Sequence, residues 1–213
     1  MIVTESSVVV VDHPLLQETL CVIRSKDTKP PEFRRAVTQA SMLIAMAATA
    51  DLPTRPVSVE TPLAVAKGRE VAVDDFVLIP ILRAGLGMVE GIMQLLPQAR
   101  VGHLGLERNE TTLEASEYYL KFPENMANSQ VFVIDPMLAT GGSAKFALAQ
   151  VKARGARHIR LLGVIAAPEG IAAIHAEHPD VPIYVAAVDE RLNEKGYIVP
   201  GLGDAGDRLF GTP

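Results

Sequence analysis

Short apolar runs that alternate with helical patterns constrain the fold of this chain more than any other feature. Residues 76–82 and 131–134 are apolar throughout, rather than at every second position. Strands of this composition are typical of parallel sheets buried on both faces. Further apolar runs cover residues 101–106, 159–166 and 182–188. The sequence therefore predicts an α/β fold with a central, mostly parallel sheet flanked by helices.

The segments before and between these apolar runs have the periodicity of helices. Residues 33–47 carry apolar side chains at three- and four-residue spacing, which places them on one stripe of a helix. Further helices are expected over residues 86–96, 144–151 and 171–176. Ahead of the first run, valines alternate with polar residues over 57–59 and 71–73, with Lys67-Gly68 between them. This pattern predicts a β-hairpin arm.

Length and charge indicate the number of domains and exclude some classes of binding partner. The chain has 213 residues, which fits a single domain over residues 1–213. Its net charge is −5, and no run of Lys or Arg is long enough to follow a polyanion. These features argue against binding to nucleic acid or to a membrane surface. No stretch approaches the roughly 20 apolar residues that a membrane helix needs.

The cysteine content bears on the compartment. Cys21 is the only cysteine, so an internal disulfide is impossible and a reducing cytoplasm is expected. The apolar residues on either side of Cys21 predict that its thiol is buried.

The segment after residues 131–134 carries the strongest functional signal. Asp135 follows the apolar run, and Thr140-Gly-Gly-Ser143 opens a helical pattern shortly afterwards. Glycines let the backbone approach a bound group, and the N–H groups at a helix N-terminus favour a phosphate. Asp135 can accept hydrogen bonds from ribose hydroxyls, so the two parts together suit a ribose 5-phosphate. Thr-Gly-Gly-Ser by itself is equally consistent with a turn that only caps a helix.

An arginine after the first apolar run is a candidate for binding a diphosphate. Arg83 follows the run over residues 76–82 and precedes two glycines, and its guanidinium could clamp a diphosphate in a bidentate way. Arg108 lies at the start of a polar segment, residues 107–130, that has no clear period. A segment of this length without regular structure is usually a functional lid or a disordered loop. We favour a mobile lid, with a hairpin that uses residues 118–120 as the alternative.

The C-terminal segment is rich in glycine. Four glycines and a proline lie between residues 196 and 208. Such a loop exposes backbone N–H and C=O groups, which could read the edge of a flat base. A glycine-rich tail without further support is more often only a turn.

These segments together resemble the type I phosphoribosyltransferases. The sequence from Asp135 to Ser143 is similar to their motif for 5-phosphoribosyl-1-pyrophosphate (PRPP), in the form found in the uracil-specific branch. Pro136 stands where most of the family carries a second acid. The loop at Arg83 resembles the pyrophosphate loop of that branch, and residues 196–208 are nearly diagnostic of it. The resemblance extends along nearly the whole chain.

The resemblance implies an activity and a role for each site residue. The chain is expected to transfer the 5-phosphoribosyl group of PRPP to N1 of uracil, giving UMP and pyrophosphate in pyrimidine salvage. The expected catalytic residues are Arg83, Asp135 and Asp204. PRPP is expected to contact Arg83, Arg108, Asp135, Pro136, Met137, Leu138, Ala139, Thr140, Gly141, Gly142, Ser143 and Asp204. Uracil is expected to contact Ile198, Gly203, Asp204 and Ala205.

The resemblance also implies partners. Mg²⁺ is the expected cofactor, carried by PRPP, without direct protein ligands except a contact through Asp204. A small C-terminal base-binding hood and a homodimer or higher homo-oligomer are expected, with the hairpin near residues 57–73 as a candidate intersubunit arm. Some members of the family are activated by GTP, so GTP is a candidate effector.

Three alternatives stay open. Some relatives keep the fold and bind RNA as regulators, although the acidic balance of this chain counts against that role. A uracil or nucleotide sensor would bind its ligand without turnover. The same chemistry on another base is the third alternative, and the C-terminal loop argues against purines.

Overall fold

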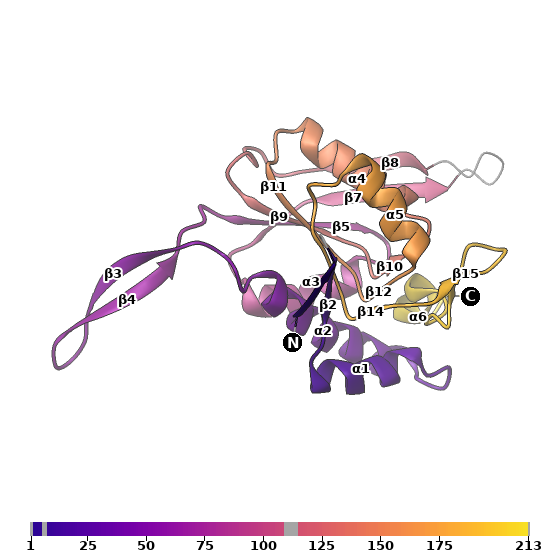
Figure 1. Ribbon diagram of the computed structural model, residues 1–213, viewed down its shortest axis with the longest axis horizontal. Helices are drawn as coiled ribbons and strands as arrows, with labels where there is room; N and C mark the ends of the chain where they lie inside the picture. The colour runs from indigo at the N-terminus through magenta and orange to yellow at the C-terminus, as the bar shows by residue number, and fades with distance from the viewer. Residues whose placement is uncertain (1, 6–7, 109–114, 213) are drawn as a thin grey trace.

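The computed structural model describes residues 2–5, 8–108 and 115–212, and is built around a twisted, mostly parallel sheet (Figure 1). Within these residues the sheet has nine strands, in the order β1-β2-β13-β11-β9-β5-β7-β8, with β6 paired to β5. The strands are β1 (Ile2–Glu5), β2 (Val8–Val11), β5 (Phe76–Leu82), β6 (Arg100–Val101), β7 (His103–Arg108), β8 (Ala115–Lys121), β9 (Gln130–Ile134), β11 (His158–Leu162) and β13 (Ile183–Val185). The β1–β2 and β7–β8 pairs at the two edges are antiparallel, and the internal pairs are parallel. The predicted sheet is confirmed.

Helices cover both faces of the sheet, as predicted. They are α1 (Pro14–Arg24), α2 (Pro30–Ala48), α3 (Leu86–Leu95), α4 (Gly142–Ala153), α5 (Pro168–Glu177) and α6 (Ala205–Phe210). Helices α1, α2 and α3 lie against one face, and α4 and α5 against the other (Figure 1). The fully buried β9 sends Phe132 into the first core and Val131 into the second. This explains why the strand is apolar at every position.

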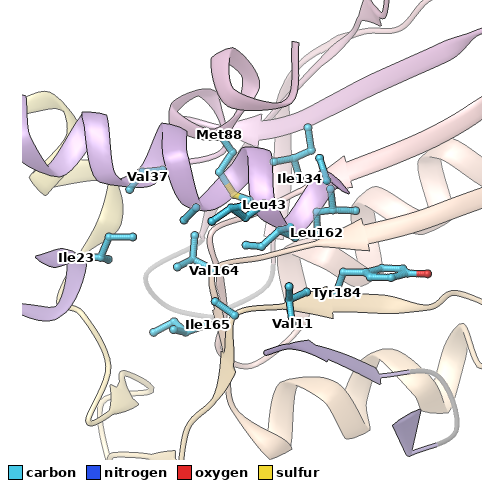
Figure 2. Packing of buried hydrophobic residues seen from close by; sticks show 14 of the residues in the cluster. Val11, Ile23, Val37, Leu43, Met88, Ile134, Leu162, Val164, Ile165 and Tyr184 are labelled. Atoms are coloured by element: carbon cyan, nitrogen blue, oxygen red, sulfur yellow. The ribbon is translucent and has the colours of Figure 1, made fainter. Parts of the chain in front are cut away.

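The first core joins the sheet to the helices that precede it. Figure 2 shows Leu43 of α2 and Met88 of α3 against Ile134 and Leu162 at the ends of two neighbouring strands. Met88 and Ile134 are completely buried. The strand ends that lead into Asp135 are therefore held by close packing from behind.

Two of the predicted strands change sheets at their carboxyl ends. Residues 159–166 and 182–188 were each expected to form one strand, but each divides between the main sheet and a small parallel sheet. That sheet contains β10 (Met137–Leu138), β12 (Ile165–Ala166) and β14 (Ala187–Val188). Pro136 explains the step, because it has no N–H to continue the ladder and its carbonyl instead accepts from the N–H groups of Val164 and Ile165.

The predicted hairpin arm is confirmed, but its turn lies elsewhere. Strands β3 (Thr54–Glu60) and β4 (Val65–Val71) pair along their length and project far from the sheet (Figure 1). Lys67-Gly68, the expected turn, lies inside β4. The chain reverses at Thr61, whose hydroxyl oxygen accepts from the N–H groups of Leu63 and Ala64. This local bonding forms the turn without a glycine.

The polar segment over residues 107–130 contains a strand. Residues Ala115–Lys121 form β8, which pairs antiparallel with β7, so the hairpin alternative is confirmed over these residues. The segment between the two strands, residues 109–114, lies outside the described residues. The expected lid motion therefore stays a prediction.

The prediction of a buried Cys21 is wrong. Its thiol is exposed, because α1 buries Leu16, Thr19, Leu20 and Ile23 on its opposite side. Among the described helices, none combines the length and apolar character needed to cross a membrane.

Candidate active site

Arg83 and Asp135 follow the carboxyl ends of two neighbouring strands of the main sheet. They follow β5 and β9, which are parallel neighbours with Pro80 paired to Ile134. The loop after β5 packs tightly here, since a methyl group added to Gly85 would lie 2.6 Å from the Ile134 carbonyl oxygen. Parallel strands gather their following loops at the carboxyl edge, where open α/β sheets bind ligands. The predicted arginine and carboxylate are therefore brought together.

The segment from Met137 to Ala144 forms a small cradle beside Asp135. Gly141 adopts a φ of +80°, which a side chain would strain, and α4 begins at the next residue. Asp135 and residues 137–144 line a cavity of about 50 Å³. This is well below the roughly 300–1,000 Å³ of pockets that enclose a whole drug-sized ligand. The cavity suits one small anionic group at a helix N-terminus, with the rest of the ligand outside.

Helix α5 supports the cradle from behind. A methyl group added to Gly170, in the first turn of α5, would lie 2.3 Å from the Ala139 carbonyl oxygen. A methyl group on Gly141 would lie 2.9 Å from the carbonyl oxygen of Gly170. The backbones of α5 and the cradle are in direct contact at Gly170 and at Gly141, so the position of the cradle depends on both residues having no side chain.

Asp135 is in an unusual electrostatic environment. Burial raises the pKa of its carboxyl from 3.8 to about 7, while a weak hydrogen bond from the Met137 N–H, at 3.5 Å, opposes that rise. Near neutral pH the carboxyl therefore exchanges readily between a form that can donate a hydrogen bond and a form that can only accept. Both forms can bond to ribose hydroxyls, which donate and accept.

Arg83 is half-exposed and contacts the C-terminal helix. Its Nη2 lies 3.3 Å from Oδ1 of Asp207, and its guanidinium lies over the Phe210 ring, 5.8 Å from the ring centroid. The peptide bond between Leu82 and Arg83 is cis. A long, weakly held ion pair leaves the guanidinium able to exchange Asp207 for another anion.

The C-terminal segment forms a small hood beside these loops (Figure 1). It comprises a short β-ribbon of β15 (Arg191–Leu192) and β16 (Ile198–Val199), followed by α6. A methyl group on Gly206 would lie 3.9 Å from Cβ of Ala84, and one on Gly196 would lie 3.8 Å from Cγ2 of Thr140. The hood therefore borders both the Arg83 loop and the cradle, as the predicted base-binding element requires.

The predicted uracil-binding residues differ in exposure. Ile198 and Ala205 are buried, with 5% and 2% of their surface exposed. Gly203 and Asp204 are exposed. Asp204 also caps α6, because its Oδ1 accepts from the Asp207 N–H at 2.9 Å.

Three of the predicted PRPP residues, Pro136, Arg108 and Leu138, offer no described side chain to the cavity. Pro136 is buried and does not line the cavity; its carbonyl is occupied by the bonds to the following strand. Arg108 ends β7, pairs with Ala115, and its side chain lies outside the described part of the structure. The Leu138 side chain lies in the second core, which leaves only its backbone to line the cavity.

Sequence reasoning missed several residues that shape this site. Asp207 pairs with Arg83, and Gly170 determines where the cradle lies. Asp207 lies within the glycine-rich segment already singled out, so its position there was a usable signal. The stretch from Ala166 to Gly170 also resembles the family, but nothing in it indicated that Gly170 packs against Ala139, which lies far away in the sequence.

Comparison with known proteins gives a consistent result. A sequence profile described as "Uracil phosphoribosyltransferase" matches residues 10–212. The chain is 58% identical to a protein of that name from Symbiobacterium thermophilum, with 97% of this chain and 99% of the relative covered. It is 55% identical to one from Thermoanaerobacter sp., with 97% and 98% covered.

Solved structures agree at the level of the fold. The AQ2163 protein from Aquifex aeolicus superposes with a TM-score of 0.90 at 39% identity, covering 95% of this chain and 97% of that one. The adenine phosphoribosyltransferase of Trypanosoma brucei superposes with a TM-score of 0.57 at 17% identity, covering 96% and 91%. The second similarity supports only a shared phosphoribosyltransferase fold.

Proposed function

This chain belongs to the uracil phosphoribosyltransferase family, and on that basis we propose how its residues divide the work of the reaction. The enzyme is a pentosyltransferase of pyrimidine salvage. It transfers the 5-phosphoribosyl group of PRPP to N1 of uracil and produces UMP and pyrophosphate. A bond forms between uracil N1 and ribose C1, the bond from C1 to the pyrophosphate oxygen breaks, and the N1 proton is released.

We propose that the cradle binds the 5-phosphate of PRPP. Residues 140–143 would donate backbone N–H groups, with the hydroxyls of Thr140 and Ser143 as further donors. Ala139 lines the cavity, but its N–H donates to the Met137 carbonyl oxygen. Asp135 would bond to the ribose hydroxyls beside the cradle. The single observation that carries this assignment is the cavity lined by Asp135 and residues 137–144, which joins a carboxylate to a helix N-terminus.

Arg83 is the proposed ligand of the diphosphate. Its guanidinium is half-exposed, lies one strand away from Asp135 and holds Asp207 only at 3.3 Å. A diphosphate carries more charge than one carboxylate and can accept two parallel hydrogen bonds, so it should displace Asp207. Arg108, at the end of β7, is proposed as a second ligand that arrives from the hairpin.

Uracil is proposed to bind the backbone of the hood. Its edge presents acceptor, donor and acceptor, which backbone N–H and C=O groups near Ile198 and from Gly203 to Ala205 would match. Cytosine would place a donor against a donor, and leaving such a group buried and unpaired is costly. The proposal thus accounts for base choice without a specific side chain.

Mg²⁺ fits this site as an ion carried by the diphosphate. Asp204 supplies an exposed carboxylate at the edge of the hood, and Mg²⁺ prefers carboxylate, phosphate and water oxygens. When bound, it would neutralise part of the charge of the leaving pyrophosphate. Positioning by Asp135, Arg83 and the cradle would then contribute most of the rate.

Formation of UMP from labelled uracil, PRPP and Mg²⁺ tests the proposal, with cytosine, hypoxanthine and orotate assayed in parallel. Product from uracil alone is expected. Product from hypoxanthine or orotate at a similar rate would overturn the assignment of the hood. Binding of uracil without any product would favour the sensor alternative.

We also propose a cytoplasmic homo-oligomer. The arm, defined as residues 54–71, carries exposed apolar side chains on a projecting hairpin, namely Val59, Leu63, Val65 and Val71. A second copy of the chain is the occupant that would cover them. GTP activation rests on the family alone, and an initial rate that stays flat as GTP is added would remove it.

A further inference from the structure

The loop between β16 and α6, residues 200–204, is held by two arginines, Arg24 at the end of α1 and Arg208 of α6. The loop has no regular secondary structure and contains two glycines with positive φ, Gly201 and Gly203. Under the proposed function its backbone groups read uracil, and hydrogen bonds weaken steeply with small changes in distance and angle. A loop with this task must be fixed in place, so the contacts that hold it bear on specificity.

Arg24 and Asp189 bind both backbone groups of Gly201. The guanidinium of Arg24, the last residue of α1, donates to both carboxylate oxygens of Asp189 at 2.9 and 2.5 Å. Its Nη1 also donates to the Gly201 carbonyl oxygen at 2.8 Å, and the Gly201 N–H donates to Asp189 Oδ2 at 2.8 Å. The Asp189 side chain is 3% exposed, so water cannot easily replace these bonds.

Arg208 fixes the next residue of the loop. It donates to the Leu202 carbonyl oxygen at 2.5 Å, and also to the carbonyl oxygens of Ile23 and Ser25 at the end of α1. Its guanidinium lies over the Phe33 ring of α2, 4.2 Å from the centroid. Leu202 is thereby tied to the same end of α1 that holds Gly201.

The two loop residues that these arginines hold, Gly201 and Leu202, lie inside the proposed uracil-binding segment. Gly201 and Leu202 fall between Ile198 on one side and Gly203 to Ala205 on the other. A methyl group on Gly201 would lie only 2.2 Å from the Ile198 carbonyl oxygen, so a shift of Gly201 must be felt at Ile198. The C-terminal end of α1 thus determines where the backbone proposed to bind uracil lies.

We propose that the Arg24–Asp189 pair and Arg208 are positioning residues that determine base selectivity. They act through the backbone of Gly201 and Leu202, not by touching uracil. This inference rests on the proposed function, because it assumes that the hood reads the base. If these residues only stabilised the fold, substituting them would lower the melting temperature and would change the KM for uracil and the KM for PRPP to the same extent.

The first test is Asp189→Asn, which keeps the shape and loses the charge and one acceptor. Because hydrogen bonds to charged groups contribute about 1.5–3 kcal/mol, we expect the KM for uracil to rise roughly tenfold or more. The KM for PRPP should stay within about twofold, since the cradle and Arg83 are untouched. The ratio of UMP formed from uracil to CMP formed from cytosine should fall.

Asp75→Asn is the matched control. Asp75 forms an ion pair with Arg100 at the opposite, amino-terminal end of β5, so the same substitution breaks an arginine–aspartate pair away from the hood. It should lower the melting temperature without changing either KM or the base ratio. Arg24→Lys is the second variant, because a lysine keeps the charge but cannot bond to Asp189 and Gly201 with the same fork. It should change the KM for uracil in the same direction.

The outcomes separate the inference from the proposed function. A selective rise in the KM for uracil in Asp189→Asn or Arg24→Lys supports the inference. Equal changes in both KM values, or unchanged values in a folded variant, overturn it while an active wild type leaves the proposed function standing. A wild type that forms no UMP would overturn both.

Discussion

The carboxyl group of Asp135 is buried, which disfavours its charged form, and it is also the group proposed to bind the ribose hydroxyls. A carboxyl in a partly enclosed position costs free energy when ionised, and its pKa of about 7 expresses that cost. A ligand that donates hydrogen bonds to it would recover part of the cost. The residue is therefore suited to binding polyols and poorly suited to a purely structural role.

The stability of the unliganded protein should record this shift in pKa. Because the folded pKa of Asp135 lies above 3.8, the folded state keeps a proton that the unfolded chain releases as the pH rises towards 7. The stabilising contribution of Asp135 to the free energy of unfolding is fully present below pH 3.8, the ordinary pKa of the group. It is lost as the pH rises from 3.8 to about 7, by an amount on the order of a few kcal/mol at most.

Denaturant unfolding of the wild type and of Asp135→Asn tests this at both ends of the window. Asparagine does not titrate, so the variant should gain stability relative to the wild type as the pH rises from about 4 to about 7. A stability difference that is independent of pH would contradict the raised pKa.

Arg83 should matter to substrate binding more than to folding. Loss of a charged hydrogen-bond donor at the diphosphate should lower kcat/KM for PRPP by about 10- to 100-fold in Arg83→Ala. The far-UV circular dichroism should stay unchanged, because the side chain is half-exposed. Arg154→Ala is the control, since Arg154 also lies over a phenylalanine ring, Phe122, but directly after the C-terminal end of α4, at the opposite end of that helix from the cradle. A similar loss in both variants would argue against a specific role for Arg83.

The residue scale also shows the limits of what the sequence can predict. Asp135 and Arg83 could be found because each follows an apolar run, and neighbouring parallel strands bring such positions together. The pairing of Arg24 with Asp189 could not be found, because 165 positions separate the two residues and nothing local marks either one. Contacts of this kind depend on how α1 packs against the hood.

Among the contacts between elements, the one between α5 and the cradle is very close. The packing leaves no room for a side chain at Gly170, where a methyl group would approach within 2.3 Å of the Ala139 carbonyl oxygen. The backbone of the cradle or the helix must then move. The position of the backbone N–H groups proposed to bind the 5-phosphate depends on this glycine, although it lies outside the motif from Asp135 to Ser143.

Gly170→Ala should therefore weaken PRPP binding as well as folding. We expect a loss of about 1–3 kcal/mol of stability and a KM for PRPP raised by roughly tenfold. Gly155→Ala is the matched control: Gly155 has a φ of +86° but no atom within 4 Å of an added methyl group. It should lose about 1–2 kcal/mol through backbone strain and keep its KM for PRPP. If Gly170→Ala binds PRPP normally, the cradle does not depend on α5.

Element boundaries were less predictable than element types. Helical periodicity located α2, α3, α4 and α5, because amphipathic stripes are local. The division of residues 159–166 between two sheets depends on Pro136 in a neighbouring strand, so the sequence of the divided strand could not reveal it. The turn of the arm was misplaced because a threonine turn substitutes for the glycine turn that was sought.

At the scale of the whole molecule, the arm has little contact with the main body and presents apolar side chains to solvent (Figure 1). Leu63 at its tip is 96% exposed. A projecting hairpin gains little stability by itself, and a second copy of the chain would cover these side chains. These exposed side chains are the reason for proposing that the arm packs against a second copy.

Leu63→Glu should shift the protein towards smaller species in sedimentation velocity at a fixed concentration. A buried, unpaired carboxylate at an interface is strongly unfavourable. Ser58→Glu adds the same charge at an exposed polar position of the arm and is the control. Sedimentation of Leu63→Glu identical to that of the wild type would show that the tip of the arm is not in an interface.

A crystal structure of the protein with UMP and pyrophosphate tests the central claim most directly. We expect the 5-phosphate within hydrogen-bond distance of the N–H groups of residues 140–143, ribose hydroxyls on Asp135, and the uracil edge on the backbone around Ile198 and Asp204. Pyrophosphate should contact Arg83 in place of Asp207. A 5-phosphate bound away from the cradle, or a base that faces away from the hood, would contradict the account.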